Sequence, residues 1–193
     1  MYLKKGQIIN LSKESPELKK LVAGIGWDMN PNDTEDDPDP ETQAFLLTDS
    51  GMVSSDRDLV FWYNLRDKSG AVVHLGDDDK AGISKGDEVE FIAIDLTKIP
   101  DHITKIVFTI TAAETITRHL CFAQVKNAFI RMYHQQTGEE IFRYGLGEDY
   151  STETAVVFGE LYQQNGEWKF KASGRGFQGG LRALCTYFGL EVS

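Results

Sequence analysis

The sequence predicts an all-β protein, a β-sandwich with a few short helices that include one at the C-terminus. Three observations favour this class: about ten short segments rich in β-branched and aromatic residues, turn residues such as DSG, DKSG, QTG and QNG between them, and few helical stretches. The 193 residues, 41% of them hydrophobic, suit one domain with a sizeable core. We therefore expect a single domain over residues 1–193.

The predicted strands follow one another along most of the chain. They are QIINL (7–11), QAFLL (43–47), DLVFWY (58–63), AVVHL (71–75), VEFIAIDL (89–96), TKIVFTIT (104–111), NAFIRMY (127–133), EEIFRYGL (139–146), TAVVFGELY (154–162) and EWKFKASG (167–174). Asn165-Gly166 is typical of a hairpin turn and predicts that the last two strands pair. The segment RMYHQQTGEEIFRY predicts a second hairpin.

Two helices are expected. One is short and lies near LCFAQVKNAF (120–129). The other is GGLRALCTYFGL (179–190), whose helical spacing places four apolar residues on one face: Leu181, Leu184, Cys185 and Phe188.

The segment GRGFQGG before the second helix contains a G-x-G-x-x-G pattern formed by Gly174, Gly176 and Gly179. A dinucleotide site would need a strand after the helix, and only 14 residues follow Gly179. We therefore expect these glycines to form a tight turn that docks the helix, and we do not expect nucleotide binding.

The net charge of −10 argues against binding to nucleic acid or to anionic membranes and favours cations. No apolar run approaches the roughly 18 residues of a membrane span, and the N-terminal residues lack the apolar core of a signal peptide. Cys121 and Cys185 are far apart and are expected to be reduced thiols of a cytoplasmic protein.

The acidic residues gather in two segments. Of the 30 Asp and Glu residues, seven lie within 27–47 and six within 74–91. In the first segment, Asp37, Asp39 and Glu41 alternate with two prolines, which favour an extended backbone. Residues two apart in an extended chain face the same side, so these three carboxylates can converge on a cation, although a solvated acidic loop remains an alternative.

The second segment, DDDKAGISKGDE from Asp77, nearly matches an EF-hand loop. It has Ala81 where the loop needs an oxygen ligand, and predicted strands flank it where an EF-hand has helices. We reject the EF-hand but keep the prediction that this segment binds a hard cation. A solvated acidic turn is the alternative.

Catalytic patterns are weak. No G-x-S-x-G or HExxH pattern occurs, and His74, His102, His119 and His134 show no paired spacing, so each is expected to be structural or solvated. A carboxylate pair could act as in a glycosidase, but it would need contrasting environments, for which Trp27 beside Asp28 is the only indication. We expect no enzyme.

Six segments together run nearly from end to end of the chain: LSKESPELKKLVAGIGWD, QAFLL, KIVFTIT, FAQVKNAFIRMY, STETAVVFGELY and EWKFKASGRGFQGGLRAL. They resemble the TerD family of bacterial tellurite-resistance and stress proteins. The resemblance implies a β-sandwich that binds calcium through acidic loops, with no established enzymatic activity. It also implies proteins of the same stress operons, near the inner membrane, as partners.

The resemblance carries over to individual positions. The Gly-Trp-Asp of the family matches residues 26–28, and its Asp-x-Asp-x-Asp matches 37–41, with glutamate in the third place. The second family loop matches Gly76–Asp78 at its start and Gly86–Glu88 at its end, around a centre with two lysines that looks two residues longer. The implied metal ligands are Asp28, Asp37, Asp39, Glu41, Asp77, Asp78, Asp79, Asp87 and Glu88.

The expected function is therefore that of a non-enzymatic stress-response protein of the tellurium-resistance type, in which the two acidic segments coordinate one or two calcium ions. The alternative is a calcium-dependent module for a glycan or a phospholipid head group. Exposed aromatic residues near the acidic segments, such as Trp27 or Trp62, would favour that alternative.

Overall fold

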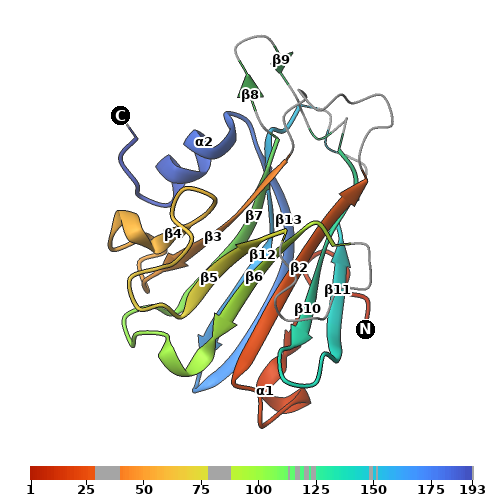
Figure 1. Ribbon diagram of the computed structural model, residues 1–193, viewed down its shortest axis with the longest axis vertical. Coiled ribbons are helices and arrows are strands. Elements are labelled where there is room, and N and C mark those ends of the chain that lie inside the picture. Colours follow the sequence, from red (N-terminus) through yellow and green to blue (C-terminus); the bar gives the residue numbers. More distant parts are fainter. Residues whose placement is uncertain are drawn as a thin grey trace.

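Two antiparallel sheets pack face to face in the computed structural model (Figure 1). The structure describes residues 1–28, 40–77, 88–112, 114–115, 118–119, 122, 125–147, 150 and 152–192. The larger sheet contains, in spatial order, β1 (Ile8–Asn10), β13 (Glu167–Phe177), β12 (Ala155–Gln164), β7 (Lys105–Thr111), β3 (Glu41–Leu47) and β4 (Leu59–Val60). The smaller one contains β11 (Glu140–Gly145), β10 (Lys126–His134), β2 (Lys20–Asp28), β6 (Glu90–Asp95) and β5 (Val72–Gly76). The predicted β-sandwich is confirmed.

The remaining elements are short. A two-stranded ribbon is formed by β8 (Glu114–Thr115) and β9 (Arg118–His119), and two 3₁₀ turns occupy Asp56–Asp58 and Leu96–Lys98. Helix α1 spans Leu11–Glu14 and helix α2 spans Gly180–Tyr187.

The main core lies between the sheets, because alternate residues of each strand turn their apolar side chains inward. Leu21 and Ile25 of β2 meet Leu46 of β3 and Phe158 of β12 in one buried cluster. Packing of both inner faces in this way positions the loops that join the two sheets.

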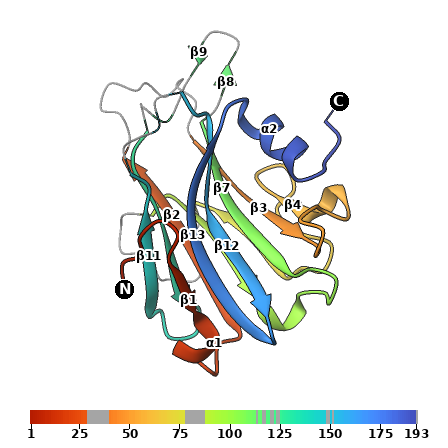
Figure 2. The same ribbon diagram turned by 180° about the vertical axis from the view of Figure 1, so that it is seen from behind.

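Helix α2 covers the outer face of the six-stranded sheet, where Figure 2 shows it beside β12 and β3. Leu184, Cys185 and Phe188 are buried there against outward-facing residues of the strands, and Leu181 packs beside them. At the start of this helix, the side-chain oxygen of Thr154 accepts hydrogen bonds from the backbone N–H groups of Gly179 and Gly180, at 3.0 and 2.8 Å. The predicted apolar face of this helix is thus confirmed.

Both predicted hairpins are present. Gln164 pairs with Glu167 around Asn165 and Gly166, which have φ values of 53° and 75°. Two successive positive φ angles are typical of the turn that best matches strand twist. The other hairpin joins β10 to β11.

Two expectations about local structure are wrong, and two elements were not expected. The helix expected near 120–129 does not form over its described end, because Lys126–Phe129 opens strand β10. The glycines of GRGFQGG do not form one tight turn, since β13 continues to Phe177 and only Gly179 caps helix α2, which begins at Gly180. Strand β2 and helix α1, where Asn10 caps the N–H of Lys13, were not expected.

The described part of the chain contains no helix that is long and apolar enough to cross a membrane.

Candidate functional site

The described ends of the two acidic segments flank the site predicted from the sequence. The first segment leaves β2 at Asp28 and enters β3 at Glu41, and the second leaves β5 just before Asp77 and returns through Glu88 to β6. Five predicted ligands lie outside the described residues: Asp37, Asp39, Asp78, Asp79 and Asp87.

A buried polar contact joins the two sheets at these strand ends. His74 Nε2 of β5 lies 3.0 Å from Thr42 Oγ1 of β3, and the Thr42 hydroxyl donates a short hydrogen bond to Glu90 of β6. The backbone N–H of Gly76 donates to His74 Nδ1 at 3.1 Å, so the ring proton sits on Nε2 and points at Thr42. The contact therefore links the start of β3 to the end of β5 and the start of β6, between which the acidic segments run.

Glu41 lies beside this contact and carries a perturbed carboxyl group. Partial burial raises its pKa, the negative charge of Glu90 raises it further, and a hydrogen bond from the Trp62 side chain and the nearby His74 act in the opposite direction. The negative charge of Glu90 thus disfavours the ionisation of Glu41 at this end of the sandwich. A cation between such groups would remove that repulsion.

Asp28 is exposed at the end of β2 and accepts a hydrogen bond from the side-chain amide of Asn127. Asn127 has a φ of 53°, within an irregularity of the β2–β10 pairing that separates Lys126 from Phe129. A bulge of this kind re-aims side chains, and here it brings the amide to the carboxylate. Trp27 is buried in the core, so it does not supply an exposed aromatic ring.

Glu88 occupies a different environment from the other described carboxylates. Its side chain is 0% exposed, and Oε1 accepts hydrogen bonds from Arg131 Nη1 at 2.9 Å and from the Tyr133 hydroxyl. Arg131 also lies 3.3 Å from Glu140 through its Nε. The pKa of Arg131 is raised because these bonds outweigh its burial, so the described contacts of Glu88 Oε1 are those of a buried ion pair.

Sequence reasoning missed Thr42, His74 and Glu90 as members of this end of the molecule. The alternation of β5 offered one signal for His74, since it shares the inward face with the core residue Val72. The partnership with Thr42, 32 residues away in the other sheet, had no local signal.

The chemistry of these groups is that of hard oxygen donors. Within the described ranges, no three His, Cys, Asp or Glu side chains come close enough to hold a metal ion. The buried Thr42 hydroxyl donates a hydrogen bond to the Glu90 carboxylate and accepts one from the His74 imidazole.

The fold and the acidic strand ends define a class: two-sheet antiparallel sandwiches with carboxylate-rich connections at one end. The model of the TerD domain matches residues 1–188, and the chain belongs to the TerD family.

Two curated relatives cover nearly the whole chain. General stress protein 16U of Bacillus subtilis (strain 168) is 45% identical over 190 residues, which is 98% of this chain and 97% of the relative. Tellurium resistance protein TerD of Serratia marcescens is 42% identical over 191 residues, covering 99% and 98% of the two chains. These relatives place the chain among stress-response and tellurium-resistance proteins.

The fold is also found in a solved structure. The crystal structure of a homologue of telluride resistance protein (TerD) from Streptomyces coelicolor A3(2) superposes with a TM-score of 0.68. It is 17% identical in sequence and covers 90% of this chain and 99% of its own. At that identity the likeness supports the sandwich alone.

Proposed function

We propose that this protein is a non-enzymatic, calcium-binding stress-response protein of the tellurium-resistance type, whose two acidic segments coordinate one or two Ca²⁺ ions. The observation that carries the proposal is the Thr42–His74–Glu90 contact, which holds the strand ends of both segments together. Without it, Glu41 and Asp77 would belong to separate sheets with no reason to share an ion.

The donor set fits calcium in its chemistry. Ca²⁺ takes six to eight oxygen ligands, mostly carboxylates, carbonyls and water. Asp28, Glu41, Asp77 and Glu90 supply carboxylates at the described ends, and the remaining predicted ligands belong to the stretches between them. When bound, the ion would supply positive charge that offsets the repulsion between Glu41 and Glu90.

A calcium titration with melting curves tests this proposal. If calcium binds only the folded protein, a hundredfold excess over Kd should add about 2.7 kcal/mol of stability. Asp39→Asn should weaken calcium binding, whereas Asp101→Asn, the same change at an exposed turn, should not. No calcium heat, together with identical melting in chelator and in calcium, would exclude the proposal, and an unchanged Asp39→Asn titration would remove that residue from the ligands.

A second candidate function is a calcium-dependent module that binds a glycan or a phospholipid head group. Trp62 favours it, because this ring is 60% exposed and yet its side chain hydrogen-bonds the predicted ligand Glu41. The neighbouring Tyr63 is 79% exposed. Calcium-dependent retention on glycan arrays or liposomes that is lost in Trp62→Ala would support this candidate, and retention that ignores calcium would count against it.

We also propose that the protein acts in the cytoplasm, at the inner membrane, with proteins of the same stress operon. Fractionation of cells before and after calcium addition, followed by identification of co-purifying proteins, tests this location.

A further inference from the structure

A groove of about 750 Å³ lies away from the acidic segments, where the N-terminal residues pass between the edges of the two sheets. Its walls are the turn at Lys4 and Lys5, the end of β11 at Tyr144, and β13 around Gly174 and Arg175. Residues between β11 and β12 also line it: Gly147, Tyr150 and Glu153. This volume lies within the range of small-molecule sites.

The groove gathers positive charge in a protein whose net charge is −10. Lys4 and Lys5 are exposed, and among the described residues no carboxylate forms an ion pair with either lysine or with Arg175. Arg175 stacks on two aromatic rings and donates to a tyrosine hydroxyl. One acid, Glu153, also lines the groove, so the cations outnumber the carboxylates there.

Backbone geometry defines both walls of the groove. The N–H of Lys4 donates to the Gln7 side chain at 3.0 Å, and the N–H of Gln7 donates back to the Lys4 carbonyl at 2.9 Å. On the opposite wall, β13 has one extra residue between Ala172 and Arg175 relative to β12, and Gly174 there has a φ of 77°. Such bulges change the direction of the neighbouring side chains.

The hydroxyl group of a buried tyrosine lies at the same place. Tyr144 is 3% exposed, and its hydroxyl oxygen lies 2.6 Å from the position that a Cβ on Gly174 would take. The hydroxyl oxygen of Tyr150 lies 2.9 Å from the same Cβ position and donates a hydrogen bond to the carbonyl oxygen of Gly174. Burial raises the pKa of Tyr144, which keeps the O–H available as a donor. The floor of the groove therefore offers the Tyr144 hydroxyl as a polar group near Lys4, Lys5 and Arg175.

We propose that this groove binds a small ligand through a phosphate or polyphosphate group. Lys4 and Lys5 provide point charges at the mouth, Arg175 provides the opposite wall, and the Tyr144 hydroxyl donates from the floor. A multiply charged phosphate matches this arrangement better than a single carboxylate does, because the cations lie on separate walls and each can contact a different oxygen. The site is independent of calcium.

Calorimetry with inorganic tripolyphosphate tests the proposal, on protein passed over a chelating resin so that calcium plays no part. Lys4→Ala/Lys5→Ala should weaken binding by about tenfold or more, and Tyr144→Phe, which keeps the buried ring, by about fivefold. Two controls carry matched changes elsewhere: Lys13→Ala/Lys19→Ala and Tyr63→Phe should both bind like the unaltered protein. Binding should also weaken as salt is added.

Three results would overturn the proposal: no heat with tripolyphosphate or with phosphate-bearing vesicles, equal losses in both lysine pairs, or citrate binding as tightly as tripolyphosphate. A parallel arm uses phosphatidylcholine vesicles with and without phosphatidic acid. Retention on the phosphatidic acid vesicles that depends on Lys4 and Lys5 supports a lipid head group as the source of the phosphate. Binding of tripolyphosphate without retention supports a soluble ligand.

Discussion

Glu88→Gln distinguishes a structural carboxylate from a calcium ligand. The pair of Glu88 Oε1 and Arg131 Nη1, 2.9 Å apart, has a Coulomb attraction of about 6 kcal/mol at an effective dielectric of 20. Much of it offsets desolvation, and removing one partner of a buried pair typically costs about 3–5 kcal/mol. Because Glu140 still faces Arg131 and the glutamine oxygen can still accept, we expect a loss of about 2–3 kcal/mol.

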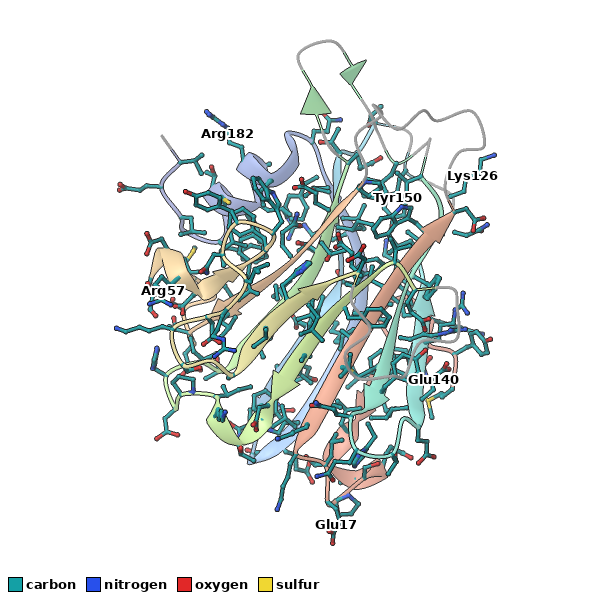
Figure 3. The ribbon with its side chains drawn as sticks, in the orientation of Figure 1. Glu17, Arg57, Lys126, Glu140, Tyr150 and Arg182 are labelled. Carbon is teal, nitrogen blue, oxygen red and sulfur yellow. The ribbon has the colours of Figure 1, made fainter. Side chains whose placement is uncertain are left out.

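The assay is urea unfolding in chelator, where calcium binding cannot contribute. For a chain of this size the loss corresponds to a fall in Tm of roughly 4–12 °C. Glu17→Gln, an equal charge change at the exposed residue labelled at the lower end of Figure 3, should stay within about 0.5 kcal/mol of the unaltered protein. The reasoning is refuted if Glu88→Gln unfolds like the control in chelator but binds calcium more weakly, since Glu88 would then act as a ligand.

Three further predictions concern other parts of the fold. Glu41→Gln should stabilise the calcium-free protein and weaken calcium binding, because burial and Glu90 raise the Glu41 pKa. The folded state holds the Glu41 proton to higher pH than the unfolded chain does, so the free energy of unfolding falls as pH rises through that range. Melting curves recorded at several pH values should show this fall for the unaltered protein and not for the variant. Gly159→Ala should unfold at a markedly lower urea concentration, since a Cβ there would lie 2.4 Å from a backbone carbonyl oxygen of β13. Gly145→Ala is the control, because a Cβ there meets open space. Equal urea midpoints for the two variants would contradict this packing. Leu184→Ala should cost about 2–5 kcal/mol in the same assay by opening a cavity under α2, and a loss below about 1 kcal/mol would mean that the helix does not seal the sheet.

The strands that sequence could predict are those whose own residues favour extended structure. KIVFTIT is a run of β-branched and aromatic residues, and it is a central strand of the larger sheet. Strand β2 is equally central but contains Gly24 and Gly26, which lower its intrinsic preference. The reason for Gly24 is tertiary, because a Cβ there would lie 2.8 Å from Glu88 Cγ. A side chain 64 positions away leaves no signal in the local pattern.

The wrong helix near 120–129 has a similar origin. Phe122, Val125 and Phe129 recur at helical spacing, but Ala128 and Ile130 belong to the inward-facing set of a strand that pairs with β2. Short apolar runs are ambiguous between the two periods, and the tertiary partner decides between them. The predicted helix at the C-terminus was clearer because its apolar stripe is longer and has polar residues opposite.

The candidate site, too, could be predicted from the sequence only in part. Composition locates both acidic segments, and the alternation of acids with prolines predicts that Asp37, Asp39 and Glu41 converge, since both are local features. What the sequence could not give was the contact that brings the segments together, because Thr42, His74 and Glu90 come from three strands in two sheets. The predicted ligand set included Glu88 and left out Glu90 for this reason.

Glu88 and Glu90 lie two residues apart, and regular strand alternation would place them on the same face. They lie on opposite sides of the five-stranded sheet, since Glu90 contacts Thr42 of the other sheet while Glu88 contacts Arg131 and Tyr133 beside the outer residues Val22 and Phe91. Val89 between them packs against the main core, so the alternation is broken where the acidic segment enters β6. Glu88 is thereby neutralised by the buried Arg131, and Glu90 is kept at the end of the sandwich where Glu41 lies. The same short stretch of chain thus stabilises the outer face of the sheet and adds negative charge where the proposed cation would bind.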